Sequence, residues 1–165
     1  MLSAVRTRSR LRAATLAGLL ALLPVAATNV AMAEGNPTTP TSSDFDSYWP
    51  PEKCADASEE FRFRFYYNSD FGAWVNIGRS IYDLAALSEG GTGSSQVLIL
   101  CEKGNGDGKR AANNSASTYN WYRDYCSVVY YKSGYKGLAD PVYPNSGGNL
   151  YHTYNNNKSI KFSSC

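Results

Sequence analysis

The sequence contains a single histidine, His152, and few of the patterns that catalytic sites need. It has no G-x-S-x-G segment, in which a sharp turn exposes a nucleophilic serine, so a Ser-His-Asp hydrolase is not indicated. Zinc enzymes commonly use several histidines, and one histidine argues against such a site. None of the 14 acidic residues sits in a context that marks a carboxylate pair for glycoside hydrolysis. The sequence therefore predicts a protein that is not an enzyme.

An excess of positive charge is also lacking once the N-terminal segment is removed. Residues 1–33 combine four arginines and no acid with an apolar run and the small residues Ala31 and Ala33, as in a cleaved secretory signal peptide. The apolar run is shorter than the ~20 residues that cross a bilayer, so no membrane span is expected. Without the four arginines, 12 basic and 14 acidic residues remain, a net charge of −2. We expect a secreted, extracellular protein of residues 34–165 that binds no nucleic acid.

The predicted mature chain has a Pro/Thr/Ser-rich leader at 34–53, expected to be extended or disordered, and one domain at 54–165. Alternating or continuous apolar segments predict strands at 61–67, 97–101, 127–131 and 159–162. Segments rich in Gly, Ser and Asn predict loops at 88–95, 104–109 and 144–148. No sustained helical period occurs, and 79–87 is the best candidate for one helical turn. These patterns indicate an all-β sandwich or Greek-key fold.

Two parts of the domain repeat one pattern. Residues 66–72 read YYNSDFG, and residues 130–137 read YYKSGYKG. Downstream, Asp83-Leu84 corresponds to Asn149-Leu150, and residues 113–117 correspond to residues 155–159. Tyr, Asn and Ser are abundant, so each match is weak by itself. Three matches in the same order favour two copies of one β unit over chance.

The four cysteines include no C-x-x-C pair, and their spacing fits no zinc motif. An even count in an exported chain predicts two disulfides and leaves no thiol for nucleophilic catalysis. Three pairings are compatible with the sequence. We favour Cys54–Cys101 and Cys126–Cys165, which place one bridge in each repeat. Each bridge would close a loop of roughly 40 residues and add about 4 kcal/mol to stability in the chain-entropy description.

The repeated Asn/Ser segments allow two interpretations. Calcium takes about six to eight oxygen ligands, and these segments offer amide and hydroxyl oxygens. The candidate ligands are Asn113, Asn114 and Ser117 in the first copy and Asn155, Asn156 and Ser159 in the second. Neither segment contains a carboxylate, so such sites would be weak. Asn and Ser side chains also bond to nearby backbone and fix turns, and we favour this structural role.

Together, the signal peptide, the two aromatic segments and the two Asn/Ser segments resemble secreted bacterial peptidase inhibitors of the Streptomyces metalloproteinase inhibitor family. The doubled pattern also looks like the βγ-crystallin-type double Greek key. The resemblance spans about residues 60–162. It implies an all-β double Greek-key sandwich with motif one at about 60–121 and motif two at about 126–165. It further implies calcium sites, because the related crystallin motif has two Asn or Asp, two free positions, then Ser or Thr and Ser.

The function that the resemblance implies is inhibition of an extracellular protease of the metallo or serine type by a tightly bound loop. The chain is expected to be a monomer that requires no cofactor, with calcium as an optional ligand. The best candidate for the inhibitory loop is 104–110, because a disulfide at Cys101 would anchor its start. Its candidate contact residues are Asn105, Asp107, Lys109 and Arg110. The pair Lys109-Arg110 suits a trypsin-like protease, although dibasic pairs are also common on solvated surfaces.

Two other functions stay open. The first is a calcium-binding βγ-crystallin-type structural or cell-surface module without inhibitory activity. The second is a toxin or carbohydrate-binding module that uses aromatic residues such as Trp74 and Trp121. Burial in the core would account for these aromatic residues equally well.

Overall fold

The computed structural model describes residues 34–38, 58–59, 61–69, 71–85, 98–101 and 104–165. All of them belong to one compact unit, Met32–Cys165. The signal peptide prediction, most of the predicted leader, and the predicted loop at 88–95 lie outside the described residues. Among the described residues, no helix is long and apolar enough to cross a membrane.

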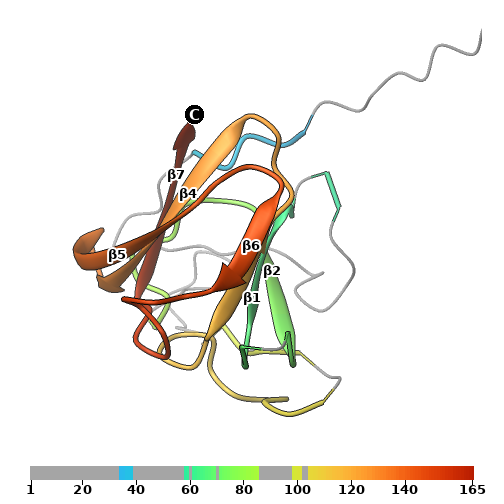
Figure 1. Ribbon diagram of the computed structural model, residues 1–165, viewed down its shortest axis with the longest axis vertical. Helices are drawn as coiled ribbons and strands as arrows, with labels where there is room; N and C mark the ends of the chain where they lie inside the picture. The colour runs from blue at the N-terminus through green and yellow to red at the C-terminus, as the bar shows by residue number, and fades with distance from the viewer. Residues whose placement is uncertain (1–33, 39–57, 60, 70, 86–97, 102–103) are drawn as a thin grey trace, which may run out of the picture. The chain divides into compact units, whose positions relative to one another are not determined.

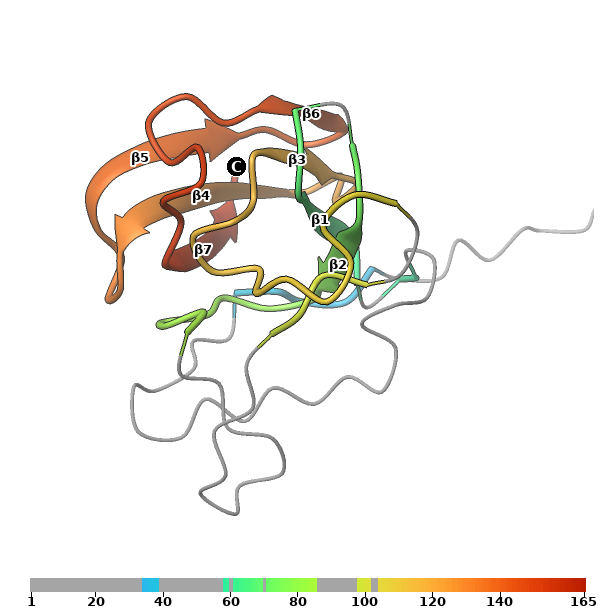
Figure 2. The ribbon, with the colours of Figure 1, turned by 90° about the horizontal axis from the view of Figure 1, so that it is seen from below.

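The described chain forms seven strands in two antiparallel sheets (Figure 1). They are β1 (Phe63–Tyr66), β2 (Trp74–Ile77), β3 (Ser117–Asn120), β4 (Tyr125–Lys132), β5 (Lys136–Val142), β6 (Ser146–Asn149) and β7 (Ser159–Ser164). The first sheet has the order β2-β1-β3-β6 and the second has the order β5-β4-β7. Figure 2 shows the two sheets as separate layers.

The strand order is the same in both halves of the chain. Each half places its first strand between its second and its last, as β2-β1-β3 in one sheet and β5-β4-β7 in the other. The third strand of the second half, β6, crosses over and pairs with β3. The equivalent segment of the first half also crosses over, because Ile81 pairs with Ile160 of β7 through N–H···O bonds of 2.8 and 3.0 Å. This exchange of third strands makes a double Greek key, and it confirms the predicted fold class.

Alternation along the strands builds the core between the sheets. Phe63 and Phe65 are fully buried, while Arg64 between them points to the opposite face of β1. The ring of Phe63 meets that of Phe162 from β7 edge to face, with centroids 5.5 Å apart. Burial of each such side chain contributes about 2–3 kcal/mol, and an edge-to-face pair adds about 1 kcal/mol. The aromatic side chains of β1 and β7 therefore hold the two sheets together.

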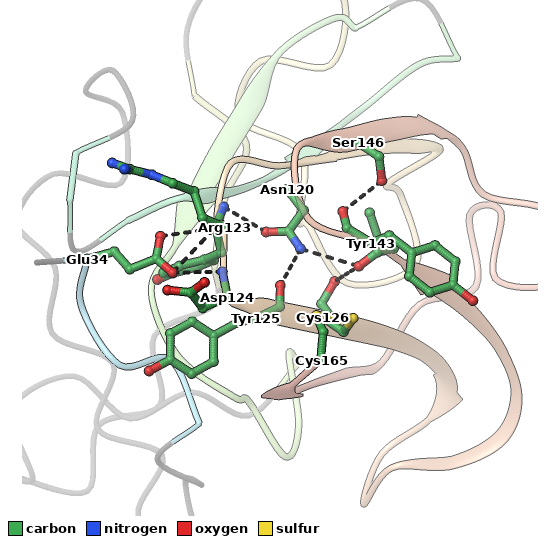
Figure 3. Close-up of a disulfide and its surroundings, with 12 residues drawn as sticks. Glu34, Asn120, Arg123, Asp124, Tyr125, Cys126, Tyr143, Ser146 and Cys165 are labelled. Carbon is green, nitrogen blue, oxygen red and sulfur yellow. Dashed lines mark hydrogen bonds between the residues drawn. A yellow bond between two sulfur atoms is a disulfide. The ribbon is translucent and has the colours of Figure 1, made fainter.

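Asn120 links the two halves at the point where the chain passes from β3 to β4 (Figure 3). Its side chain is fully buried, and its amide nitrogen donates to the carbonyl oxygens of Tyr125 and Val142. Its amide oxygen accepts the N–H of Tyr122 at 3.0 Å. A buried polar side chain with these bonds satisfied fixes how β3, β4 and β5 meet.

The predicted pairing of Cys126 with Cys165 is confirmed, and it ties the end of β7 to β4 (Figure 3). Cys101 is also disulfide-bonded, but its predicted partner, Cys54, lies outside the described residues. Among the described cysteines there is no free thiol.

The start of the predicted leader is docked on the domain. Pro37 is buried, and its carbonyl oxygen accepts bonds from both the N–H and the hydroxyl of Ser80. The Glu34 carboxylate accepts the backbone N–H groups of Arg123 and Asp124 at 3.0 Å (Figure 3). Residues 34–38, which end in a turn at Pro37 and Thr38, are therefore held in place, whereas the composition alone allowed disorder.

Three predictions of local structure were wrong. The described part of 79–87 contains no helical turn, because Ile81 is the point where the third strand of the first half crosses to the other sheet. Segment 144–148 was predicted as a loop but includes most of β6, where the glycines of a Ser-Gly-Gly-Asn strand allow close packing on β3. The described part of the predicted strand 97–101 forms only isolated bridges, from Ile99 to Arg110 and from Cys101 to Trp74.

Candidate functional site

The two aromatic segments form equivalent turns at the ends of β1 and β4. Phe71 and Tyr135 occupy the same place in the repeat, and both have left-handed backbone conformations, with φ of 57° and 58°. Each packs on the first tyrosine of its own segment, Tyr66 or Tyr130, with ring centroids 4.7 and 6.0 Å apart. A positive φ is uncommon for a bulky residue. Its occurrence at both positions confirms that the repeat read from the sequence is a structural duplication.

The serines of the two Asn/Ser segments brace these turns. The hydroxyl of Ser117 donates to the carbonyl oxygen of Asn68 at 2.5 Å, and the hydroxyl of Ser159 donates to the carbonyl oxygen of Lys132 at 2.7 Å. Ser159 also accepts the N–H of Tyr135 at 3.1 Å. Both serines are fully buried. Their hydroxyls therefore satisfy backbone groups inside the fold.

The asparagines that begin the two segments each donate a backbone hydrogen bond to the other segment. Asn113 and Asn155 are both left-handed, with φ of 61° and 52°. The N–H of Asn113 donates to the carbonyl of Asn157, and the N–H of Asn155 donates to the carbonyl of Ser115, both at 3.0 Å. Since Asn157 and Ser115 are equivalent in the repeat, this is a reciprocal pair of bonds that joins the two halves.

The structure gives these segments a structural role that needs no ion. Asn114 and Asn156 use their amide nitrogens to bond to the carbonyls of Ala112 and Tyr154, which closes the same local turn twice. The described residues contain no group of three or more His, Cys, Asp or Glu side chains that could hold a metal. The oxygen donors present are neutral, and the two serine hydroxyls are buried and bonded. This set fits a calcium ion poorly, because calcium favours carboxylates in an open cage.

The candidate inhibitory loop is a short hairpin connection held by backbone bonds. The N–H of Leu100 donates to the carbonyl of Lys109, and the N–H of Gly108 donates back to the carbonyl of Leu100. Arg110 pairs with Ile99 at the base of this hairpin. The side chains of Asn105, Asp107, Lys109 and Arg110 are all exposed.

Gly106 anchors the same loop to the domain. It is buried and has a φ of 101°, and a Cβ atom there would lie 2.1 Å from the ring of Tyr67. The carbonyl of Asn105 accepts the N–H of Ala73 at 3.2 Å. The loop is therefore fixed from inside by a glycine and an aromatic ring, which the glycine-rich sequence did not indicate.

Among the residues that the structure describes, His152 is not part of a Ser-His-Asp arrangement. Its side chain is exposed, and its ring makes no hydrogen bond to any part of the chain that is described. The ring packs edge to face on Tyr151, with centroids 4.8 Å apart. His152 is thus an exposed histidine whose ring contacts Tyr151.

Asp140 is an important polar residue that the sequence did not reveal. Its carboxylate is buried and accepts the N–H groups of Tyr151, His152 and Thr153, together with the hydroxyl of Thr153 at 2.7 Å. Burial alone would raise the pKa of Asp140, but the Thr153 hydroxyl and the three N–H groups hold it below the ordinary value. The side chain anchors the loop after β6 to β5. No signal in the sequence indicated this role, because no strand was predicted around Asp140.

Comparison with known proteins adds little beyond the fold. No protein-family model matches the chain, and no curated protein matches it. Among solved structures, the chain is similar to one reported as "Evolution of the eye lens beta-gamma-crystallin domain fold", with a TM-score of 0.44 and 8% sequence identity. The match covers 67% of this chain and 93% of that chain. The assignment of the fold rests on the strand order described above, and the function is inferred from the residues of this chain.

Proposed function

We propose that this protein is a secreted, non-catalytic inhibitor of an extracellular peptidase, and that loop 104–110 enters the peptidase active site. The observation that supports this proposal is the shape of the loop. It carries four exposed polar or charged side chains on a backbone that is already fixed at Leu100, Gly106 and Lys109. A segment fixed before binding loses little conformational entropy when it binds, which is the general requirement for a tight inhibitory loop.

The charge of the loop favours a particular kind of peptidase. Lys109 and Arg110 are adjacent and exposed, and both lie on the side of the hairpin that returns to the domain. A serine peptidase with an acidic specificity pocket would accept either side chain. The exposed Asp107 carboxylate offers an alternative contact, to the metal ion of a metallopeptidase. The two peptidase classes can therefore be distinguished by which substitution weakens inhibition. A serine peptidase would depend on Lys109 or Arg110, and a metallopeptidase on Asp107.

The test is a titration of the oxidised protein against a trypsin-like, a subtilisin-like and a thermolysin-like peptidase. We expect stoichiometric inhibition of at least one, with an inhibition constant that rises at least about a hundredfold in the double variant Lys109→Ala/Arg110→Ala if the target is trypsin-like. For a metallopeptidase, Asp107→Asn should have the larger effect. Lys136→Ala, an exposed change on β5, is the matched control and should leave inhibition unchanged.

The proposal is wrong if the folded, oxidised protein inhibits none of the three at micromolar concentration. The placement of the loop is wrong if inhibition occurs but neither loop variant weakens it. A further variant, Gly106→Val, would force the loop off Tyr67 and should weaken inhibition even though all four exposed side chains remain.

A calcium-binding structural module is the second candidate function. It is favoured by the equivalent positions of Asn113 and Asn155, which place two left-handed turns in reciprocal contact. The neutral donors imply weak binding, with a dissociation constant of about a millimolar. At calcium concentrations tenfold above that value, mass action would add about 1.4 kcal/mol, which is a rise of a few degrees in melting temperature.

Thermal unfolding of the serine variants separates the structural role from calcium binding. Ser117→Ala and Ser159→Ala should each lower the metal-free stability by about 1–2 kcal/mol, because each removes a buried hydroxyl that bonds to the backbone of a turn. Ser164→Ala, an exposed serine in β7 outside both segments, serves as the control. If calcium is the purpose of these segments, the serine changes should cost little without calcium and abolish a calcium-dependent rise that magnesium does not reproduce.

A further inference from the structure

An aromatic cluster surrounds a single arginine on the outer face of the first sheet. Because Phe63 and Phe65 point into the core, Arg64 points to the opposite face of β1, where Tyr66 also lies but is itself buried. In the register of the sheet, Arg64 lies between Asn76 of β2 and Tyr119 of β3. We call the set Arg64, Tyr66, Trp74, Tyr119 and Trp121 the Arg64 cluster. Trp74 and Trp121, for which burial in the core was one explanation, lie partly exposed on this outer face.

The guanidinium group of Arg64 is held in one orientation. Its central carbon lies 4.8 Å from the ring centroid of Trp74 and 5.0 Å from that of Trp121. Its Nε donates to the amide oxygen of Asn76 at 2.6 Å. Each cation–π contact contributes about 0.5–1 kcal/mol at an exposed site and more where water is excluded. The side chain is therefore ordered before any ligand arrives.

Arg64 has no acidic partner within the described part of the chain. The neighbouring outward-facing cation, Arg62, is paired with Glu59 and also donates to the carbonyl oxygen of Trp121. Burial raises the pKa of Tyr66, and the positive charge of Arg64 opposes that effect. The two terminal nitrogens of Arg64 form a planar fork, the geometry that binds a carboxylate with two parallel bonds.

The second sheet provides an internal comparison, because the two halves are duplicates. Aligning Tyr66 with Tyr130 places Val128 at the position of Arg64, and the strand registers then place the remaining equivalents. Trp74, Asn76, Tyr119 and Trp121 correspond to Ala139, Pro141, Lys161 and Ser163. The same fold is thus built in the second sheet without an arginine or a tryptophan at these positions. The Arg64 cluster is not a requirement of the double Greek key.

We propose that the Arg64 cluster is a second binding surface, separate from loop 104–110, for a partner protein that presents an acidic side chain. Trp, Tyr and Arg are the residue types that contribute most to the stability of protein interfaces. A fixed guanidinium with no carboxylate partner among the described residues supplies the charge complementarity, and the flanking rings exclude water from the ion pair that forms. The mature chain is slightly acidic overall, so the attraction of an acidic partner must be local to this face.

The geometry favours a peptide carboxylate over a uronic-acid sugar. Sugars stack on open faces of aromatic rings. Here Arg64 lies over one face of Trp74 and one of Trp121, and Tyr119 packs against Trp121 with ring centroids 4.5 Å apart. The guanidinium therefore covers one face of each tryptophan, which reduces the open ring surface on which a sugar could stack.

The test uses poly-L-glutamate as the probe and the tryptophan fluorescence of the oxidised protein as the readout, confirmed by calorimetry. We expect binding that weakens as the ionic strength rises. Arg64→Lys keeps the charge but loses the planar fork, and it should weaken binding at least about tenfold. Lys136→Arg, at an exposed side chain on β5 of the other sheet, should bind as the parent protein does. Polygalacturonate is titrated in parallel as the sugar source of carboxylates.

Each outcome decides the proposal. It is supported if poly-L-glutamate binds, if Arg64→Lys binds at least tenfold more weakly, and if polygalacturonate binds more weakly than poly-L-glutamate. It is overturned if poly-L-glutamate does not bind, if Arg64→Lys binds equally well, or if polygalacturonate binds as tightly or more tightly. If Arg64→Lys proves unstable, Trp121→Phe takes its place and should weaken binding severalfold. Peptidase inhibition by the Arg64 variant should be unchanged, which separates this surface from the proposed inhibitory loop.

Discussion

Asp140→Asn is expected to lower the free energy of unfolding by about 3 kcal/mol at neutral pH. The carboxylate accepts four hydrogen bonds from residues 151–153, three of them from backbone N–H groups. An asparagine keeps one oxygen but turns an NH2 group toward donors, so at least one buried N–H loses its acceptor. Urea denaturation of the two proteins measures the difference. Asp124→Asn, at an exposed side chain, is the matched control and should change stability by less than about 0.5 kcal/mol.

The same substitution has a predictable dependence on pH. The pKa of Asp140 in the folded protein is lowered from the ordinary value of 3.8. A group with a lowered folded pKa stabilises the fold fully above its unfolded pKa, and this contribution is lost as the pH falls through the folded pKa. The stability difference between the parent and Asp140→Asn should therefore be constant near neutrality and shrink below about pH 4. A difference that stays constant down to the acid unfolding transition would contradict the assigned role of the carboxylate.

Removal of the disulfide in the double variant Cys126→Ser/Cys165→Ser is expected to lower the free energy of unfolding by about 4 kcal/mol. The bridge closes a loop with a sequence separation of 39 residues, and the chain-entropy description gives this magnitude. The loss should come with fraying of β7, because the bridge holds the last residue of that strand region to β4. Hydrogen exchange of the Phe162 and Ser164 amides would detect the fraying.

The control for this variant is Ser164→Ala, an exposed change in the same strand. If the double serine variant loses less than about 1 kcal/mol, the strand pairing between β4 and β7 is sufficient and the bridge is not a major source of stability. Guanidinium denaturation under oxidising conditions keeps Cys101 in its bonded state during the comparison.

The duplication and the core were readable from the sequence because both depend on periodic side chains. The alternation of Phe and Arg at 61–65 predicted β1 and its buried face, and the repeated YY segments predicted the two equivalent turns. These signals are local, and burial of one face of a strand is enough to specify them.

Four strands were missed, β2, β3, β5 and β6, and two of them carry especially weak local signals. β3 follows directly from an Asn/Ser turn, and β6 consists of Ser, Gly and Asn. Both depend on pairing with distant strands, since β3 is held between β1 and β6. The crossing of Ile81 to β7 is set by contacts separated by 79 residues in sequence, which no local pattern reveals.

The candidate site was predictable in part. The position of loop 104–110 and the exposure of its charged residues followed from composition, but the support from Gly106 on Tyr67 depends on a contact between segments far apart in the chain. The Arg64 cluster likewise required the sheet register, because Arg64, Trp74 and Trp121 come from three separate segments.

The contacts of Asp124 bring the two ends of the folded chain to one place. Its N–H donates to the Glu34 carboxylate at 3.0 Å, and its carbonyl oxygen accepts the N–H of Cys165 at 3.2 Å. Glu34 and Cys165 are therefore close together in space, because both bond to the backbone of Asp124. A short peptide joining residue 165 to residue 34, with new termini opened elsewhere, would give a circular permutant in which the second motif is synthesised before the first. Because the two motifs have equivalent folds, we expect the domain to form with the motifs in the permuted order.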